Sequence, residues 1–298
     1  METETIVTLF IPFTIMMIML SMGLTLKIRD FMLVLREPLA VFTGVIAQLI
    51  ILPLLGFGIA WGLSPSPQQA VGLVLVASCP GGPSSNLMTR LAGGDIALSV
   101  ALTAVSGCVT MFSIPMYCKL AASTFAPHLP ELSLPIMETT IQLVLVMGLP
   151  LILGMTLLAY APQWAQRLEH YVKRSATVLL ALLIIGALFK SRHELAEYGW
   201  IEVIPAIVLS LSGMILGLVL SVVFRLTPAQ RVAIPIEVGT QNGALAIGLA
   251  LTALHSQEVA FPCVVYGTFM YLPCAIMVWL GHRYLNSLAI EYPQILES

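Results

Sequence analysis

Nine apolar segments, each close to the length that crosses a lipid bilayer, make up most of this chain. A helix needs about 20 apolar residues to cross the hydrocarbon core. Because lipid offers no hydrogen-bond partners, a chain crosses it only as helices or as a closed barrel. We therefore predict an all-α polytopic membrane protein with nine transmembrane helices, at residues 6–26, 39–63, 70–91, 96–120, 136–161, 172–189, 201–224, 232–254 and 259–280.

The composition excludes several classes of soluble protein. Of the 298 residues, 58% are hydrophobic and only 9% are charged, whereas an average soluble domain carries about 25% charged residues. The net charge of −2 leaves no basic excess for binding nucleic acid. The connections between the segments are short, so residues 1–298 are expected to form a single membrane domain.

The basic residues predict the orientation in the membrane. With the N-terminus outside, ten of the 13 Lys and Arg residues fall on the inner side, as the positive-inside rule requires. These ten are Lys27, Arg29, Arg36, Arg90, Arg167, Lys173, Arg174, Arg225, Arg231 and Arg283. We expect a multi-pass protein of the plasma (inner) membrane with a cytoplasmic C-terminus.

Two of the apolar segments contain polar interruptions that a regular helix does not tolerate. In the third segment, two prolines and two glycines fall within Pro80–Pro83 and are followed by Ser84, Ser85 and Asn86. In the eighth, Pro235, Gly239 and Gly243 flank Glu237 and a run of polar residues. Proline and glycine weaken helical hydrogen bonding. Unwound backbone at this depth is tolerated only when it is buried in protein or lines a cavity.

The places of the two interruptions predict an inverted repeat. If the first four and the last four spans are compared, each interruption lies in the third helix of its half; the halves extend approximately over residues 1–122 and 136–284. The first half begins outside and the second inside. Paired broken helices in inverted halves are typical of secondary transporters with a binding site near the midplane. An enzyme is not expected, because all five His residues are placed in loops or at span ends, away from Glu237.

Glu237 is the one carboxylate placed deep in a predicted span. A central charge costs roughly 2.5–3.5 kcal/mol on insertion scales. A hydrogen-bonded structural carboxyl and a proton-coupling carboxyl are alternatives to a cation ligand. The neighbouring Ser, Thr, Asn and Gln oxygens favour a small hard cation over a transition metal.

Three further polar side chains become candidate ligands in combination with the broken helices. Ser99 and Thr103 are four residues apart and share one helical face, although such a pair usually bonds to its own helix carbonyls. Gln48 lies inside the second span, where a lone Gln usually joins two helices.

Several motifs resemble those of the bile acid:sodium symporter family and its bacterial homologues, and the similarity covers nearly the whole chain. The most specific stretches are Cys79-Pro80-Gly81-Gly82 and Glu237-Val238-Gly239-Thr240-Gln241-Asn242. Weaker matches are residues 23–27 with Asp30 and Phe31, residues 44–48, residues 83–89 and residues 97–100.

The resemblance implies two sodium sites and a substrate cavity. The first sodium site would use Ser85, Asn86, Ser99, Thr103 and Glu237. The second would use Gln48, Glu237, Val238, Thr240 and Gln241. The substrate would meet Pro83, Ser84, Asn86, Asn242 and Thr268. The resemblance also implies a core of spans 2, 3, 4, 7, 8 and 9, in which the broken spans 3 and 8 cross, and a panel of spans 1, 5 and 6.

Two departures from the family pattern bear on the substrate and the ions. Thr240 stands where some members have Met, and Thr268-Phe269-Met270-Tyr271 replaces a His-Asn pair of some members that bind bile acids. Other members carry pantoate or 2-oxo acids. The expected function is sodium-coupled, alternating-access symport of an organic anion, bile acid-like or a smaller carboxylate, by a monomer with two coupling ions. The alternative is a proton-coupled or uncoupled carrier or effluxer on the same scaffold.

Overall fold

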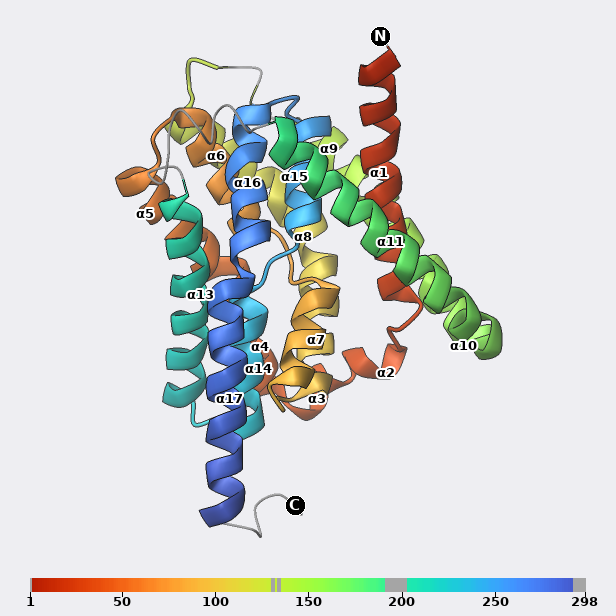
Figure 1. Ribbon diagram of the computed structural model, residues 1–298, viewed down its shortest axis with the longest axis vertical. Helices are drawn as coiled ribbons and strands as arrows, with labels where there is room; N and C mark the ends of the chain where they lie inside the picture. Colours follow the sequence, from red (N-terminus) through yellow and green to blue (C-terminus); the bar gives the residue numbers. More distant parts are fainter. Residues whose placement is uncertain (1, 130–131, 133–134, 191–202, 292–298) are drawn as a thin grey trace.

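The computed structural model describes residues 2–129, 132, 135–190 and 203–291, and the regular structure of these residues is helical (Figure 1). The predicted all-α fold is confirmed for this part of the chain. The helices are α1 (Glu2–Gly23), α2 (Ile28–Phe31), α3 (Leu33–Arg36), α4 (Pro38–Ile46), the π-helical turn η1 (Ala47–Ile51), α5 (Leu52–Leu63), α6 (Pro67–Ala77), α7 (Pro83–Leu91), α8 (Ile96–Phe125), α9 (Ile136–Leu143), the π-helical turn η3 (Val144–Gly148), α10 (Leu149–Tyr160), α11 (Pro162–Lys190), α13 (Ile204–Val223), α14 (Pro228–Gly239), α15 (Gly243–Thr252), α16 (Gln257–Phe269) and α17 (Tyr271–Glu291).

Among the described residues, five helices are long and apolar enough to cross a membrane by length and composition. They are Pro38–Leu63, Ile96–Phe125, Ile136–Tyr160, Ile204–Val223 and Gln257–Leu285. A sixth is added if Leu9–Gly23 and Ile28–Arg36, which are bent by 82°, count as one span. These helices confirm a polytopic membrane protein, and the number nine stays a prediction.

The first helix ends three residues earlier than the sequence predicts. Its apolar run continues to Leu26, but α1 ends at Gly23. Gly23 and Gly154 of α10 pack so closely that a Cβ on Gly154 would lie 2.7 Å from the carbonyl carbon of Gly23. This close packing of two helix backbones places the end of α1 against α10.

Both predicted interruptions are present in the structure. α6 ends at Ala77 and α7 begins at Pro83, so the Pro-Gly-Gly sequence lies between the two helices. α14 ends at Gly239, and Asn242 caps α15 by accepting a hydrogen bond from the Leu245 amide at 3.1 Å. Proline suits the first turn of a helix, where its missing N–H has no partner to lose.

The two breaks meet each other. Gly81 and Gln241 form an isolated antiparallel β-bridge, and the Asn242 amide donates to the Pro80 carbonyl at 2.8 Å. In Figure 1, α6 and α15 lie toward one end of the molecule, and α7 and α14 toward the other. The backbone groups released by each break are therefore partly satisfied by the other break.

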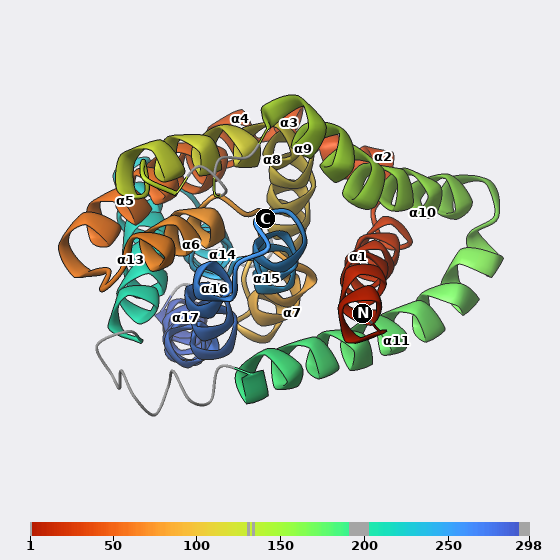
Figure 2. The ribbon, with the colours of Figure 1, turned by 90° about the horizontal axis from the view of Figure 1, so that it is seen from above.

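The helices fall into two groups. α1 packs against α10 and α11, and Figure 2 shows these three on one side of the molecule. The other group contains the four halves of the broken helices together with α4, η1, α5, α8, α13, α16 and α17, and its α15 and α16 contact the first group.

The second halves of the two broken helices are unequally buried. Residues 243–250 of α15 are all buried, whereas only Ser85 and Thr89 are buried in α7. α15 is covered on one side by α1, because a Cβ on Gly248 would contact the Ile15 side chain and lie 3.1 Å from Cγ2 of Ile11.

Candidate functional site

The carboxylate of Glu237 lies at the centre of the polar cluster around the two breaks. The residue is on the last turn of α14 and is completely buried. Its Oε2 accepts a hydrogen bond from the Ser99 hydroxyl at 2.8 Å, and its Oε1 accepts one from Thr103. The predicted shared face of Ser99 and Thr103 therefore meets Glu237, although Thr103 also bonds the Ser99 carbonyl of its own helix at 3.0 Å.

The Ser99 hydroxyl has two oxygen acceptors within hydrogen-bond distance and one proton to donate. Ser99 Oγ lies 2.8 Å from Glu237 Oε2 and also 2.8 Å from Asn86 Oδ1. A hydroxyl has a single proton and donates it to one acceptor at a time. Thr103 Oγ1 is also 3.4 Å from Asn86 Oδ1. A positive charge placed among these oxygens would balance the excess of lone pairs, and oxygen-only sets of this kind suit hard cations.

Ser85 is next to Asn86 at the start of α7 and is completely buried. Its hydroxyl donates to the Gly82 carbonyl at 2.7 Å, which stabilises the turn that leads into α7. The structure thus brings together the whole set that the resemblance implies for the first sodium site.

The set implied for the second sodium site gathers around the backbone carbonyls of Glu237 and Val238. Gln48 Nε2 donates to Gln241 Oε1 at 3.3 Å and lies 3.5 Å from the Glu237 carbonyl oxygen. Gln241 Nε2 donates to the Val238 carbonyl at 2.7 Å. Within the described part of the chain, Gln48 Oε1 is buried and has no hydrogen-bond partner. Such a group needs an explanation, because an unpaired buried acceptor costs about 1–3 kcal/mol.

Thr240 belongs to the same set and is also completely buried. In the described residues its Oγ1 is a second buried oxygen without a hydrogen-bond partner.

Gly81 makes room for the contact between the breaks. A Cβ at this position would collide with Oε1 of Glu237, and would lie 2.9 Å from its Cδ and 3.3 Å from Nε2 of Gln48. A glycine at the crossing therefore lets the first break approach both ion-ligand candidates.

The residues implied for substrate binding surround the start of α7 and α15. Pro83 and Ser84 form the partly exposed first turn of α7. Asn242 is 6% exposed and, among the described residues, its Nδ2 is a buried donor without a partner. Thr268 donates to the Val264 carbonyl of its own helix at 2.8 Å. It follows Gly267, whose Cα would lie 2.9 Å from a Cβ on Gly243.

Three hydroxyl groups donate hydrogen bonds to backbone carbonyls next to these candidate ligands, and the sequence did not predict them. Tyr117 donates to the Leu49 carbonyl at 2.9 Å. In a regular α-helix the Leu49 carbonyl would accept a hydrogen bond from the amide of residue 53, but that residue is Pro53, which has no N–H. Tyr266 and Ser210 both donate to the Gly239 carbonyl, at 2.9 and 3.0 Å. Each lies in an apolar run; the one available signal was that a buried hydroxyl needs an acceptor.

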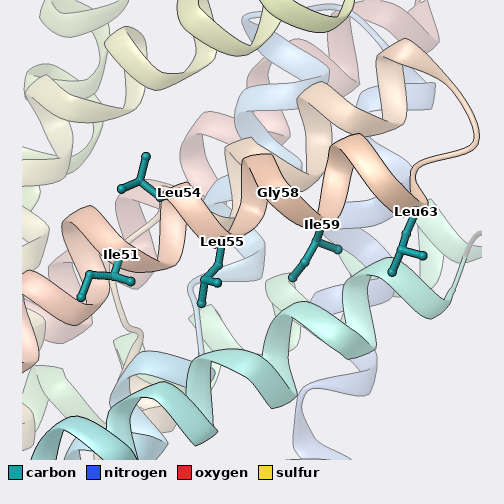
Figure 3. Close-up of a pocket in the computed structure, with 6 residues that line it drawn as sticks. All are labelled: Ile51, Leu54, Leu55, Gly58, Ile59 and Leu63. Atoms are coloured by element: carbon teal, nitrogen blue, oxygen red, sulfur yellow. The ribbon is translucent and has the colours of Figure 1, made fainter.

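An apolar groove of the described structure is separate from this cluster. It has a volume of about 430 Å³ and is lined by Ile51 of η1 and by Leu54, Leu55, Gly58, Ile59 and Leu63 of α5. Figure 3 shows Leu55, Ile59 and Leu63 directed toward α13. All of its lining side chains are apolar, so it offers no recognition chemistry for an ion or a polar substrate.

Comparisons with known proteins agree with the motifs. Residues 12–197 match the sequence profile of the Sodium Bile acid symporter family. An uncharacterized sodium-dependent transporter of Bacillus subtilis (YocS) is 32% identical over 85% of this chain and 76% of its own length.

Two further relatives come from a plant and from a mammal. A probable sodium/metabolite cotransporter of rice chloroplasts (BASS2, Oryza sativa subsp. japonica) is 36% identical over 83% of this chain, which spans only 58% of that relative. The hepatic sodium/bile acid cotransporter of Rattus norvegicus is 25% identical over 93% of this chain and 75% of its own length.

Proposed function

The chain belongs to the sodium bile acid symporter family, whose members similar to it are transporters and not enzymes, and on this premise we propose that it is a sodium-coupled symporter of an organic anion. The observation that carries the proposal is the excess of oxygen acceptors around the buried carboxylate of Glu237. Ser99 Oγ has one proton and two acceptors at 2.8 Å.

Two sodium ions are proposed as coupling ions. The first is held by Ser85, Asn86, Ser99, Thr103 and Glu237. The second is held by Gln48, Glu237, the carbonyls at Val238 and Thr240, and Gln241. The unpaired Oε1 of Gln48 supports the second site, because it supplies a buried oxygen for which the described protein offers no donor. Sharing one carboxylate between both sites ties the two ions to each other.

An organic anion is proposed as the substrate. The first turns of α7 and α15 begin at the crossing, and the N-terminus of a helix favours negative charge. The unpaired Nδ2 of Asn242 adds a hydrogen-bond donor at the start of α15. Pro83, Ser84, Asn86 and Thr268 complete the proposed surface, which lies between the α1–α10–α11 group and the rest of the molecule.

The membrane arrangement is part of the same proposal. We propose nine spans, counting each broken helix once, in an inverted repeat that works as a monomer by alternating access. α2, α3, the turn between α13 and α14 and the end of α17 all lie toward the same end of the molecule (Figure 1). They carry Arg29, Arg36, Arg225 and Arg283, which supports a cytoplasmic C-terminus in a plasma membrane.

Uptake into proteoliposomes that contain the full chain tests the function. Radiolabelled taurocholate, pantoate and a 2-oxo acid are supplied in turn under an inward sodium gradient, under a choline gradient and under a pH gradient. Uptake that requires sodium supports the proposal. Equal uptake with sodium and choline, or uptake driven by the pH gradient alone, supports the uncoupled or proton-coupled carrier instead.

A further inference from the structure

The Gly239 carbonyl is placed where a sodium ligand would be expected. It belongs to the last residue of α14, between Val238 and Thr240, and half-helix C-terminal ends commonly coordinate sodium in transporters. In a continuous helix this carbonyl would accept from the amide of Gly243. That amide instead donates to the Gln241 carbonyl at 2.9 Å, so the break releases the Gly239 oxygen.

Two side chains from other helices take up this released oxygen. Tyr266 of α16 donates to it at 2.9 Å and Ser210 of α13 donates at 3.0 Å. Tyr266 is completely buried and Ser210 is 1% exposed. A carbonyl oxygen has two lone pairs, and both are occupied here. The Gly239 oxygen therefore has no lone pair left to bind a cation.

The neighbouring carbonyls differ in their donors. The Val238 carbonyl accepts from Gln241 Nε2 at 2.7 Å, and the Glu237 carbonyl has Gln48 Nε2 at 3.5 Å. In both cases the donor is the side chain of a proposed ion ligand, and each oxygen keeps a lone pair. The two hydroxyls on Gly239 thus fix the orientation of the peptide unit that directly follows the Glu237 and Val238 carbonyls.

Close packing makes the arrangement possible. A Cβ on Gly239 would collide with Met214 and lie 3.1 Å from the Ser210 carbonyl, so glycine allows α13 to approach. The residue after Tyr266 is Gly267, which touches Gly243. α16 therefore contacts the last residue of α14 and the first residue of α15, on both sides of the break.

We propose that Tyr266 and Ser210 are positioning residues for sodium binding, which hold the Gly239 carbonyl away from the ions and so set the direction of the carbonyls on either side. This inference rests on the proposed sodium coupling. Without either hydroxyl, the Gly239 peptide unit is free to rotate. This rotation would turn the Gly239 oxygen toward the cations or change the direction of the neighbouring ligand carbonyls.

The test is binding of radioactive sodium to the purified full chain, with Tyr266→Phe and Ser210→Ala as separate variants. A net hydrogen bond contributes about 0.5–1.5 kcal/mol, so we expect a rise in the sodium Kd of about 2- to 10-fold for each variant. The KM for substrate at saturating sodium should stay unchanged, whereas a general packing defect would change this KM as well. The ratio of sodium to lithium affinity should also fall.

Matched controls separate this role from stability. Ser221 is on the same helix as Ser210 but bonds the Leu218 carbonyl of that helix at 2.8 Å, and Tyr160 is 88% exposed. Ser221→Ala and Tyr160→Phe should bind sodium like the wild type. If Tyr266→Phe does not fold, Ser210→Ala carries the test. Unchanged or tighter sodium binding in the folded variants overturns the positioning role. Absence of sodium binding in the wild type overturns the proposed function itself.

Discussion

Ser99 of α8 donates a hydrogen bond of 2.8 Å to the carboxylate of Glu237, which is 138 residues further along the chain. The contact joins an unbroken helix to the last turn before the second break. The same hydroxyl lies 2.8 Å from Asn86, which follows the first break. One side chain therefore links both broken helices, and a change at this place acts on both.

Replacement of Glu237 by Gln should abolish sodium-driven uptake. The amide keeps the size of the side chain but removes the negative charge that both proposed ions share. We expect uptake at the background level of empty proteoliposomes, with the protein still inserted in the membrane at wild-type amounts. The matched control is Glu258→Gln, since Glu258 lies exposed on the first turn of α16. Sodium-dependent uptake like the wild type in Glu237→Gln contradicts a coupling role for this carboxylate.

Removal of the Ser99 hydroxyl should weaken sodium binding without preventing it. A hydrogen bond to a charged group contributes about 1.5–3 kcal/mol, and each 1.4 kcal/mol is about tenfold in affinity. Ser99→Ala should therefore raise the sodium Kd by about 10- to 150-fold, measured as binding of radioactive sodium. Ser123→Ala is the control on the same helix, because this exposed hydroxyl bonds only the Leu120 carbonyl at 2.9 Å among its described contacts. Equal affinities in the two variants would remove Ser99 from the site.

A methyl group at Gly81 should separate the two breaks. The added carbon would lie 2.9 Å from Cδ of Glu237, and overpacking of this kind typically costs about 1–3 kcal/mol. We expect Gly81→Ala to lower the Tm and to lose sodium-dependent uptake. Gly62→Ala is the control, since a Cβ there meets no atom of the described structure within 4 Å. Full activity of Gly81→Ala would show that the crossing tolerates a wider spacing than the structure has.

Sodium should tighten the binding of the organic anion, and the anion should tighten the binding of sodium by the same factor. Without a cation, we expect the oxygens around Glu237 to repel one another and to disturb the first turn of α7, which belongs to the proposed substrate surface. Couplings of this kind are usually 1–3 kcal/mol, or about 5- to 150-fold. The measurement is a substrate titration at zero and at saturating sodium, with potassium keeping the ionic strength constant. Equal substrate affinities in the two salts leave symport without a mechanism.

The breaks could be predicted from the sequence because their causes are local. Pro80, Gly81 and Gly82 weaken helical hydrogen bonding wherever they occur in a chain, and the same holds for Gly239 and Gly243. The candidate ligands near the breaks were found for the same reason. Ser99, Thr103 and Gln48 were assigned to particular sodium sites only through the family resemblance, because their partners lie far away in the sequence.

The positioning hydroxyls could not be predicted. Tyr266 reads as one more large side chain in an apolar span, and its acceptor is 27 residues earlier in the chain. The hydroxyl of Tyr117 compensates for Pro53, which lies on another helix. The end of α1 at Gly23 depends on its packing with Gly154. All three features depend on tertiary contacts that leave no periodic pattern in the sequence.

The unequal burial of α7 and α15 bears on how a blocking compound would reach the protein. In this conformation α7 is partly exposed, whereas α15 is buried and is covered by α1 at Gly248. A membrane-impermeant inhibitor that recognises the start of α7 would then act only from the cytoplasmic side of the proposed orientation. Its potency in vesicles would depend on the fraction of molecules inserted with that side outward. A substitution that separates Gly248 from Ile15 would expose α15 to compounds on the other side of the membrane.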